Sequence, residues 1–396
     1  MKKVISIISL LLVISFLLVN LKTTAQAATN QLIKQSTYVY QSNSFKSNIV
    51  GDIIVGGIKP NQKVTIIQRG KAPNTEWMKV KFVNQFGQSQ QGWINPNGTI
   101  KKIDKPTTLY SVPMKTNSKL NTKTLSSGVC NIVGYSMTGW YKVLYNGQTY
   151  FMPDWLRTVT LDVDTMSYDD PSSMNQTGTV KKGVSYSILD EKPGNWYKIK
   201  ANNKNVWVKK VKNPRTNDKV FDTAVSTVIK LEGKYLSDHP LDKGGKTRYG
   251  ITQAVYDNYR DKIKLPHQDV NDISINEVKT IYQNSYYKDI HASEMSPKLA
   301  TVMLDTAVNF GNGTAYVIFQ RALGIVGKEA QALNWGELTD YSFNNLSVSQ
   351  EDELAKRIIF ERMRSRYNIV NNNKTQASFL KGWLERDKQL KTTLGL

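Results

Sequence analysis

The sequence contains few cysteines and histidines, and this limits its chemistry. Cys130 is the only cysteine in 396 residues, so the fold must rely on core packing rather than on a disulfide framework. Cys130 lies in a strand-like apolar stretch without a Cys-His signature, which predicts a small core residue rather than a catalytic thiol. His239, His267 and His291 form no HExxH or other metal-ligand spacing. We therefore expect neither a catalytic metal nor a cofactor.

Long apolar runs are absent beyond the first 21 residues. Two lysines precede an uncharged apolar run over residues 4–21, and Ala25-Gln26-Ala27 then gives the small-x-small pattern of a signal peptidase site. These features predict a secretory signal peptide over residues 1–27. An uncleaved membrane anchor is the alternative, because the run is just long enough to cross a bilayer. No cysteine stands directly after the run, so we expect no lipoprotein anchor. We also expect no stable membrane insertion after cleavage. The expected location is extracellular or associated with the cell wall.

Acidic residues are scarce in the first half of the mature chain. Residues 28–212 hold 25 Lys and Arg against 10 Asp and Glu, whereas residues 213–396 hold 25 against 22. A basic domain is attracted to polyanions, and outside a cell these are wall teichoic acids and anionic lipid headgroups. Export and the lack of a nucleic-acid-binding motif argue against nucleic acid. A basic surface that only aids solubility is the plain alternative to teichoic acid binding.

Three tryptophan-centred repeats occupy this basic half. Trp77, Trp140 and Trp196 each stand in a similar turn-Trp-x-Lys-aliphatic context, and each unit adds a Tyr-rich strand and an alternating strand. Short strands with period-2 alternation and frequent turn residues predict small β-barrels. In this interpretation the tryptophans are core anchors rather than ligand platforms.

The repeats resemble the bacterial SH3-like modules (SH3b and, more loosely, GW-type) that hold extracellular proteins on cell walls. In the strand that follows the central tryptophan of each repeat, the Gly-Trp pair is kept at Gly92-Trp93 and is replaced in the other two repeats. The resemblance predicts SH3-like repeats over residues 28–103, 104–159 and 160–212.

Beyond a basic, polar linker predicted at residues 213–218, the apolar periodicity changes from 2 to 3.6. Helix-boundary signals occur at Ser274 with Glu277 (a capping box), at Ser296 with Pro297 (a helix start) and at Gly324 (a helix end). We therefore expect a multidomain chain of three small all-β barrels followed by an all-α, lysozyme-like domain over residues 219–396, which is long enough for one full core.

Glu232 and Asp242 are the candidate catalytic carboxyls. Glu232 continues the apolar stripe of a predicted helix, where partial burial would raise its pKa as a general acid requires. Asp242 lies in a glycine-rich turn, where a hydrated carboxylate stays charged, and Thr247 could orient an attacking water. Two carboxyls with separated pKa values can divide the acid and base roles of glycoside hydrolysis. The alternatives are an Asx-type turn residue for Asp242 and a solvated helix-end residue for Glu232.

The same segment resembles glycoside hydrolase family 108, a group of lysozyme-like N-acetylmuramidases. The family elements Glu-Gly-Gly-Tyr, Pro-x-Asp-x-Gly-Gly-x-Thr and Gly-Ile-Thr are matched by Glu232, Gly233 and Tyr235, by Pro240, Asp242, Gly244, Gly245 and Thr247, and by Gly250, Ile251 and Thr252. The resemblance extends over residues 219–390 and implies that Glu232 is the catalytic acid. Residues 379–386 resemble the peptidoglycan-binding segment that closes such proteins, here about residues 315–390.

Four residues are expected to bind substrate in the catalytic domain: Tyr235, Tyr286, Tyr287 and Asn309. Simple packing for Tyr286 and a helix-end cap for Asn309 are the alternatives. Two positions depart from the family pattern. Lys234 replaces the second glycine, and its charge would lower the Glu232 pKa unless it points away. Tyr287 stands where the family often has Trp.

Three functions follow from these patterns. The leading hypothesis is hydrolysis of the β-1,4 bond after N-acetylmuramic acid in peptidoglycan, with inversion under Glu232, Asp242 and Thr247. The second is a lytic transglycosylase, which also needs one acid but ends in a 1,6-anhydro product. The third is a non-catalytic wall-binding protein in which Lys234 has silenced the site.

Overall fold

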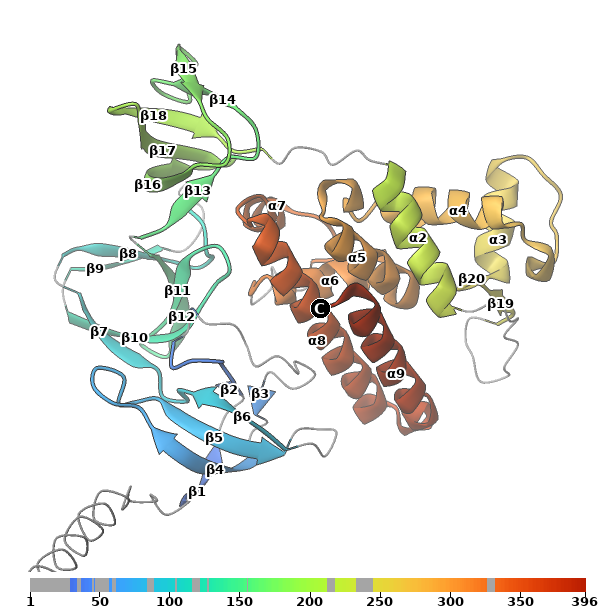
Figure 1. The fold of residues 1–396 in the computed structure, drawn as a ribbon, viewed down its shortest axis with the longest axis horizontal. Helices are drawn as coiled ribbons and strands as arrows, with labels where there is room; N and C mark the ends of the chain where they lie inside the picture. The colour runs from blue at the N-terminus through green and yellow to red at the C-terminus, as the bar shows by residue number, and fades with distance from the viewer. Residues whose placement is uncertain are drawn as a thin grey trace, which may run out of the picture. The chain divides into compact units, whose positions relative to one another are not determined.

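A computed structural model describes most of the chain after the predicted signal peptide. The described residues are 29–33, 37–44, 46, 57–58, 62–83, 89–103, 105–115, 122–126, 128–154, 156–211, 218–232, 245–325 and 332–396. The chain divides into two compact units, Met1–Gly98 and Thr99–Leu396. β-Sheets make up the first part of the described chain and α-helices the last part, as expected for the order of the two regions (Figure 1).

The three repeats share one strand order. The second sheet runs β7-β10-β11-β12-β8-β9 and the third β13-β16-β17-β18-β14-β15, so every strand of the third has its counterpart six strands earlier. The first sheet, β1-β4-β5-β6, and the hairpin β2-β3 follow the same order, and the isolated bridge Tyr40–Trp93 lies where β6 would meet β2. Over the described residues these strand orders are linear and no sheet closes into a ring, so the SH3-like barrel form of the repeats stays a prediction.

The strands of the first unit are β1 (Thr29–Ile33), β2 (Thr37–Tyr38), β3 (Gly57–Ile58), β4 (Gln62–Arg69), β5 (Met78–Val83) and β6 (Ser89–Ile94). The second repeat comprises β7 (Thr99–Ile103), β8 (Thr107–Tyr110), β9 (Thr122–Leu125), β10 (Gly128–Tyr135), β11 (Trp140–Tyr145) and β12 (Gln148–Pro153). The third comprises β13 (Thr158–Thr160), β14 (Thr165–Tyr168), β15 (Gln176–Val180), β16 (Ser185–Lys192), β17 (Trp196–Ala201) and β18 (Lys204–Lys209).

Two strands at the predicted repeat boundaries pair with the repeat that follows them. β7 pairs with β10 of the second repeat, and β13 pairs with β16 of the third. Residues 99–103, which the sequence prediction assigns to the end of the first repeat, thus pair with a strand of the second. A sequence pattern does not record which strands pair, so these two pairings come from the structure.

A Tyr–Trp pair recurs in each repeat. The three pairs are Tyr40–Trp77, Tyr110–Trp140 and Tyr168–Trp196, all edge-to-face, with ring centroids 5.6, 5.4 and 5.4 Å apart. Trp77 and Trp140 are buried, and Trp196 is half-buried. This geometry confirms the prediction of core anchors for Trp77 and Trp140, since edge-to-face rings stabilise a core beyond their buried area. Cys130 is likewise a buried residue of the second repeat's core, as predicted.

The described residues of the C-terminal region are helical apart from one short hairpin of β19 (Thr247–Arg248) and β20 (Ile251–Thr252). Its helices are α2 (Asp218–Glu232), α3 (Gln253–Lys262), α4 (Ile275–Tyr282), α5 (Pro297–Phe310), α6 (Asn312–Ala322), α7 (Glu337–Asn344), α8 (Val348–Asn372) and α9 (Ala377–Leu394). Short turns lie at η2 (Val270–Asp272), η3 (Gln283–Tyr287), η4 (Ala292–Glu294) and η6 (Lys374–Gln376). In the part of the chain described here, none of the helices is long and apolar enough to cross a bilayer.

The predicted helix boundaries are confirmed. Ser274 and Glu277 form a reciprocal capping box at the start of α4. Pro297 is the first residue of α5, where its missing N–H costs no hydrogen bond. Gly324 follows the end of α6 with φ of 87°, a conformation that glycine adopts without strain.

Helix α5 forms the centre of the domain. Every residue from Leu299 to Ala307 is buried, and α2, α6 and α8 pack against it. Helix α9 packs on α8 and α2. Residues 315–390, predicted as a peptidoglycan-binding segment, therefore contribute α6–α9 to the same domain as Glu232.

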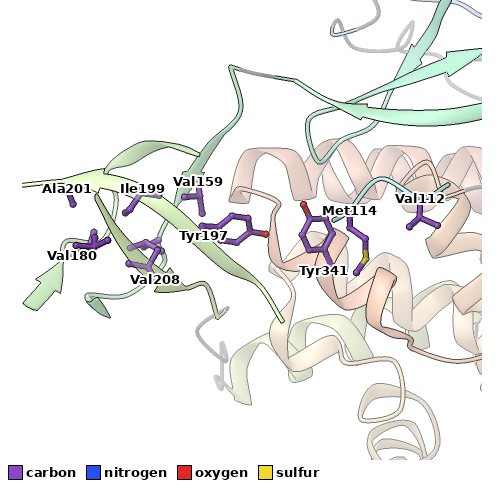
Figure 2. Packing of buried hydrophobic residues seen from close by; sticks show 11 residues of the cluster. Val112, Met114, Val159, Val180, Tyr197, Ile199, Ala201, Val208 and Tyr341 are labelled. Atoms are coloured by element: carbon purple, nitrogen blue, oxygen red, sulfur yellow. The ribbon is translucent and has the colours of Figure 1, made fainter. Parts of the chain in front are cut away.

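Helix α7 contacts the second and third repeats through Tyr341, which belongs to the same hydrophobic cluster as Tyr197 (Figure 2). The Tyr341 hydroxyl donates to Glu191 Oε2 at 2.9 Å and accepts from Arg157 Nη1 at 3.2 Å. Trp140 Nε1 adds a longer bond of 3.4 Å to the same oxygen. Arg157 and Glu191 also form a buried ion pair, 2.9 Å between Nη2 and Oε2. We call Tyr341, Arg157 and Glu191 the Tyr341 cluster.

Candidate active site

Glu232 is the last described residue of α2. Val225 and Val228 are fully buried on the same helix, and this apolar face carries Glu232 toward α5 and α9. The Glu232 side chain retains 16% of its exposure. Its Oε1 accepts a 2.6 Å hydrogen bond from Arg386 Nη2 of α9, and Asn309 Nδ2 of α5 lies 3.4 Å from the same oxygen. The predicted acid therefore lies at the edge of the core and still reaches solvent.

Burial raises the pKa of Glu232 above its ordinary value. The Arg386 guanidinium opposes this shift, whereas the negative charge of Asp305 adds to it. The raised pKa agrees with the sequence prediction for this position. A carboxyl in this environment can hold a proton at a pH where an exposed Glu would lose it.

A chain of alternating charges extends from Glu232 into the core. Arg386 Nη2 also lies 2.6 Å from Asp305 Oδ1, and Arg362 Nη1 lies 2.7 Å from Asp305 Oδ2. Arg362 Nη2 then contacts Asp387 at 2.7 Å, and Asp387 pairs with Arg366 at 2.9 Å. Asp305, Arg362 and Asp387 are fully buried. Each buried charge has an oppositely charged neighbour, which is the condition under which charges are tolerated in a core.

The Gly250-Ile251-Thr252 element packs directly against the acid. Gly250 has φ of 68°, and a Cβ built on it would lie 2.9 Å from Glu232 Cδ and 3.1 Å from Oε1. Ile251 is fully buried, and the Thr252 side chain caps α3 by accepting from Val255 N. Each residue of this element thus has a structural role. Gly250 leaves room for the carboxyl, Ile251 anchors the element in the core, and Thr252 caps a helix.

Of the other predicted catalytic residues, the structure describes only Thr247. Thr247 lies on β19, opposite Thr252 in the hairpin that carries Gly250. Its hydroxyl donates to the Gly245 carbonyl oxygen at 2.8 Å. Asp242, Tyr235 and Lys234 lie outside the described residues, and their predicted roles stay predictions.

Two neighbouring tyrosines face different surroundings in a π-helical turn, η3. Tyr286 is half-buried, and its pKa is raised first by burial and then by the charge of Glu232. Tyr287 is 6% exposed, and its ring packs edge-to-face on Phe221 with centroids 5.0 Å apart. The structure thus brings Asn309 to Glu232, and Tyr286 is close enough to feel the charge of this carboxyl. Tyr287 has a packing position and offers little surface to a sugar.

Sequence reasoning missed Arg386 and Asp305 as partners of Glu232. The sequence does carry a signal for the neighbouring buried arginines of α8, because the apolar series Leu354, Ile358 continues at the same spacing to Arg362 and Arg366. Charged residues on an apolar helix face require buried partners. Nothing in the sequence says that Arg386 reaches a carboxyl 154 residues away.

Comparison with known proteins gives one family match. Residues 225–311 match the family model described as Glycosyl hydrolase 108. The chain carries a glycosyl hydrolase 108 domain. It is therefore a glycoside hydrolase, and the match implies a lysozyme-like enzyme that acts on peptidoglycan. The glycosyl hydrolase 108 segment contains Glu232, Gly250 and Asn309, but it ends before α6, so Arg386 lies beyond it.

Among solved structures, one similar chain is titled "Structure of Brucella abortus SagA". It is 21% identical, with coverage of 45% of this chain and 95% of that chain and a TM-score of 0.35. No curated protein matches the chain.

Proposed function

We propose that this protein hydrolyses the β-1,4 bond between N-acetylmuramic acid and N-acetylglucosamine in peptidoglycan, with Glu232 as the general acid. One observation carries the proposal: Glu232 combines a raised pKa with 16% exposure and an exposed amide, Asn309, beside it. The protonated carboxyl would donate its proton to the glycosidic oxygen as the bond breaks. Tyr286 and Asn309 would border the sugar that occupies the site.

Water attack completes the reaction in this proposal. Asp242 would act as the base, and Thr247 would hold the water through its hydroxyl oxygen. The product would then have inverted configuration. A separation of about 5.5 Å or less between the Glu232 and Asp242 carboxyls would instead indicate a retaining enzyme.

A lytic transglycosylase is the second candidate, and the burial of the Asp305 carboxylate favours it. Among the described residues, Asp305 is the carboxylate whose charge acts on Glu232. It is fully buried and bound by Arg386 and Arg362, so it is closed to an attacking water. With Glu232 as the sole acid, attack by the substrate's own 6-hydroxyl would give a 1,6-anhydro product.

The repeats supply wall binding in this proposal, and the protein acts outside the cell. Their support is their basic composition together with the cations above their tryptophans. Lys192 Nζ lies 4.9 Å from the Trp207 ring centroid, and Lys209 Nζ lies 6.0 Å from that of Trp196. Wall teichoic acid is the polyanion that such SH3-like repeats would meet.

The test is turbidity loss of purified Gram-positive peptidoglycan, with mass spectrometry of the reduced fragments. Wild type is expected to clear the suspension and to leave reducing muramic acid ends, whereas Glu232→Gln leaves it turbid. Glu385→Gln on α9 is the matched control, since that glutamate is 56% exposed and has no role in the proposed reaction. Clearing by Glu232→Gln would overturn the assignment of the acid, and 1,6-anhydro ends from wild type would replace hydrolysis by transglycosylation.

A further inference from the structure

We propose that Arg386 is the positioning residue for Glu232, and that buried Asp305 holds Arg386 in place while sharing its charge. This inference rests on the proposed function, since it assigns a role to a neighbour of the proposed acid. It also makes the C-terminal helix α9 part of the catalytic site, although α9 lies outside the glycosyl hydrolase 108 match.

The geometry centres on one nitrogen. Arg386 Nη2 lies 2.6 Å from Glu232 Oε1 and 2.6 Å from Asp305 Oδ1. The two protons on Nη2 allow one bond to each carboxylate. Asp305 is fully buried, and its second oxygen is held by Arg362 at 2.7 Å. Arg386 is therefore fixed from the core side and presents its other N–H to the acid.

This contact leaves one oxygen of Glu232 available. Oε1 is bound by Arg386 and approached by Asn309. Across the described ranges, the hydrogen bonds of Glu232 are made to Oε1 alone. Oε2 is thus the oxygen that can carry the proton and pass it to a glycosidic oxygen. A carboxyl anchored at one oxygen keeps a defined orientation for the proton on the other.

The charges around Glu232 come from several packed elements. Arg386 of α9 and Arg362 of α8 lower its pKa, whereas burial and Asp305 of α5 raise it. Tyr282 of α4 and Tyr286 of η3 have raised pKa values, so both stay neutral near pH 7. Because Asp305 already pairs with Arg386, Glu232 is bound by the arginine without being locked in its ionised form.

The arrangement predicts opposite pH effects for two substitutions. The alkaline limb of the kcat profile reports deprotonation of the acid. Removing a positive charge in Arg386→Gln should move this limb to higher pH, and kcat should fall on the order of 10- to 100-fold because the carboxyl is no longer oriented. Removing a negative charge in Asp305→Asn should move the limb to lower pH. KM should stay nearly constant in Arg386→Gln, since Arg386 orients the acid rather than the sugar.

The experiment measures kcat and KM against pH on soluble peptidoglycan fragments for the full-length wild type, Arg386→Gln, Arg386→Lys and Asp305→Asn. Arg386→Lys keeps the charge, so its limb should stay near that of wild type with part of the rate restored. Lys388→Gln, a 69% exposed position on the same helix, is the matched control and should behave as wild type. Thermal unfolding of each variant is recorded in parallel.

Two results would overturn the inference. One is a wild-type rate in Arg386→Gln; the other is a loss of rate that follows the loss of thermal stability, with no shift of the limb. If Asp305→Asn does not fold, the comparison of Arg386→Gln with Arg386→Lys still decides. Full activity of Glu232→Gln would instead refute the proposed function itself, so the two failures are distinguishable.

Discussion

The Tyr341 cluster and the Glu232 site use the same chemical groups to different ends. In the Tyr341 cluster, one arginine and one carboxylate pair at 2.9 Å, and their side chains are 7% and 2% exposed. At the Glu232 site, Arg386 is shared by two carboxylates, and Glu232 and Arg386 keep 16% and 14% exposure. A closed, balanced pair stabilises a contact between domains. A shared arginine at the edge of the core leaves one carboxyl with a raised pKa and access to solvent.

The largest expected effect on stability comes from breaking the buried end of the charge chain. Asp387→Asn leaves Arg366 without its carboxylate and Arg362 with Asp305 alone, although both arginines are almost completely buried. Removing one partner of a buried pair costs about 3–5 kcal/mol. Urea unfolding of wild type and Asp387→Asn measures this loss in the free energy of unfolding. An exposed control, Asp352→Asn, should change it by less than about 1 kcal/mol.

Gly250→Ala should damage the acid more than the fold. Its Cβ would meet Glu232 Cδ at 2.9 Å, and its φ of 68° strains any residue with a side chain. We expect roughly 1–2 kcal/mol of lost stability. The rate on peptidoglycan should fall on the order of 100-fold, because a displacement of about 1 Å at a reacting group has that effect. Gly382→Ala is the control, since its added Cβ meets open space within α9. An unchanged rate in Gly250→Ala would contradict the packing argument.

Tyr341→Phe tests the closed cluster. It removes the hydroxyl that bonds Glu191 and Arg157 but keeps the ring in its apolar cluster. Leaving buried polar partners unsatisfied costs about 1–3 kcal/mol. Thermal unfolding should show this loss, while the rate on soluble peptidoglycan fragments stays at the wild-type value. A large loss of that rate would show that the two clusters are not functionally separate.

The smallest effect concerns the stability cost of the acid itself. The folded state raises the Glu232 pKa above 4.5, so the folded protein binds this proton more tightly than the unfolded protein does. Stability is therefore lost as pH rises from the ordinary value through the raised one. Glu232→Gln cannot ionise, so its Tm should exceed that of wild type near pH 7. Calorimetry should show this difference disappearing at about pH 3.5, where both states of wild type are protonated.

The sequence predicts these regions unequally. The threefold repetition, the capping box at Ser274 and the position of Glu232 on an apolar helix face all follow from local patterns. Local patterns do not specify strand partners, so the strand order of each repeat comes from the structure alone. They do not specify long-range ion pairs either. The partners of Glu232 come from α5 and α9, and only the packed fold brings these helices to α2.

The most direct test of the central claim is the pH dependence of kcat/KM for wild type on soluble peptidoglycan fragments, with Glu232→Gln measured alongside. The account predicts an alkaline limb clearly above the ordinary pKa range of a glutamate, about 4.3, because burial and Asp305 raise the Glu232 pKa. It also predicts a loss of about 10²- to 10⁴-fold in Glu232→Gln. A limb at or below the ordinary value, or a Glu232→Gln variant as fast as wild type, would contradict it.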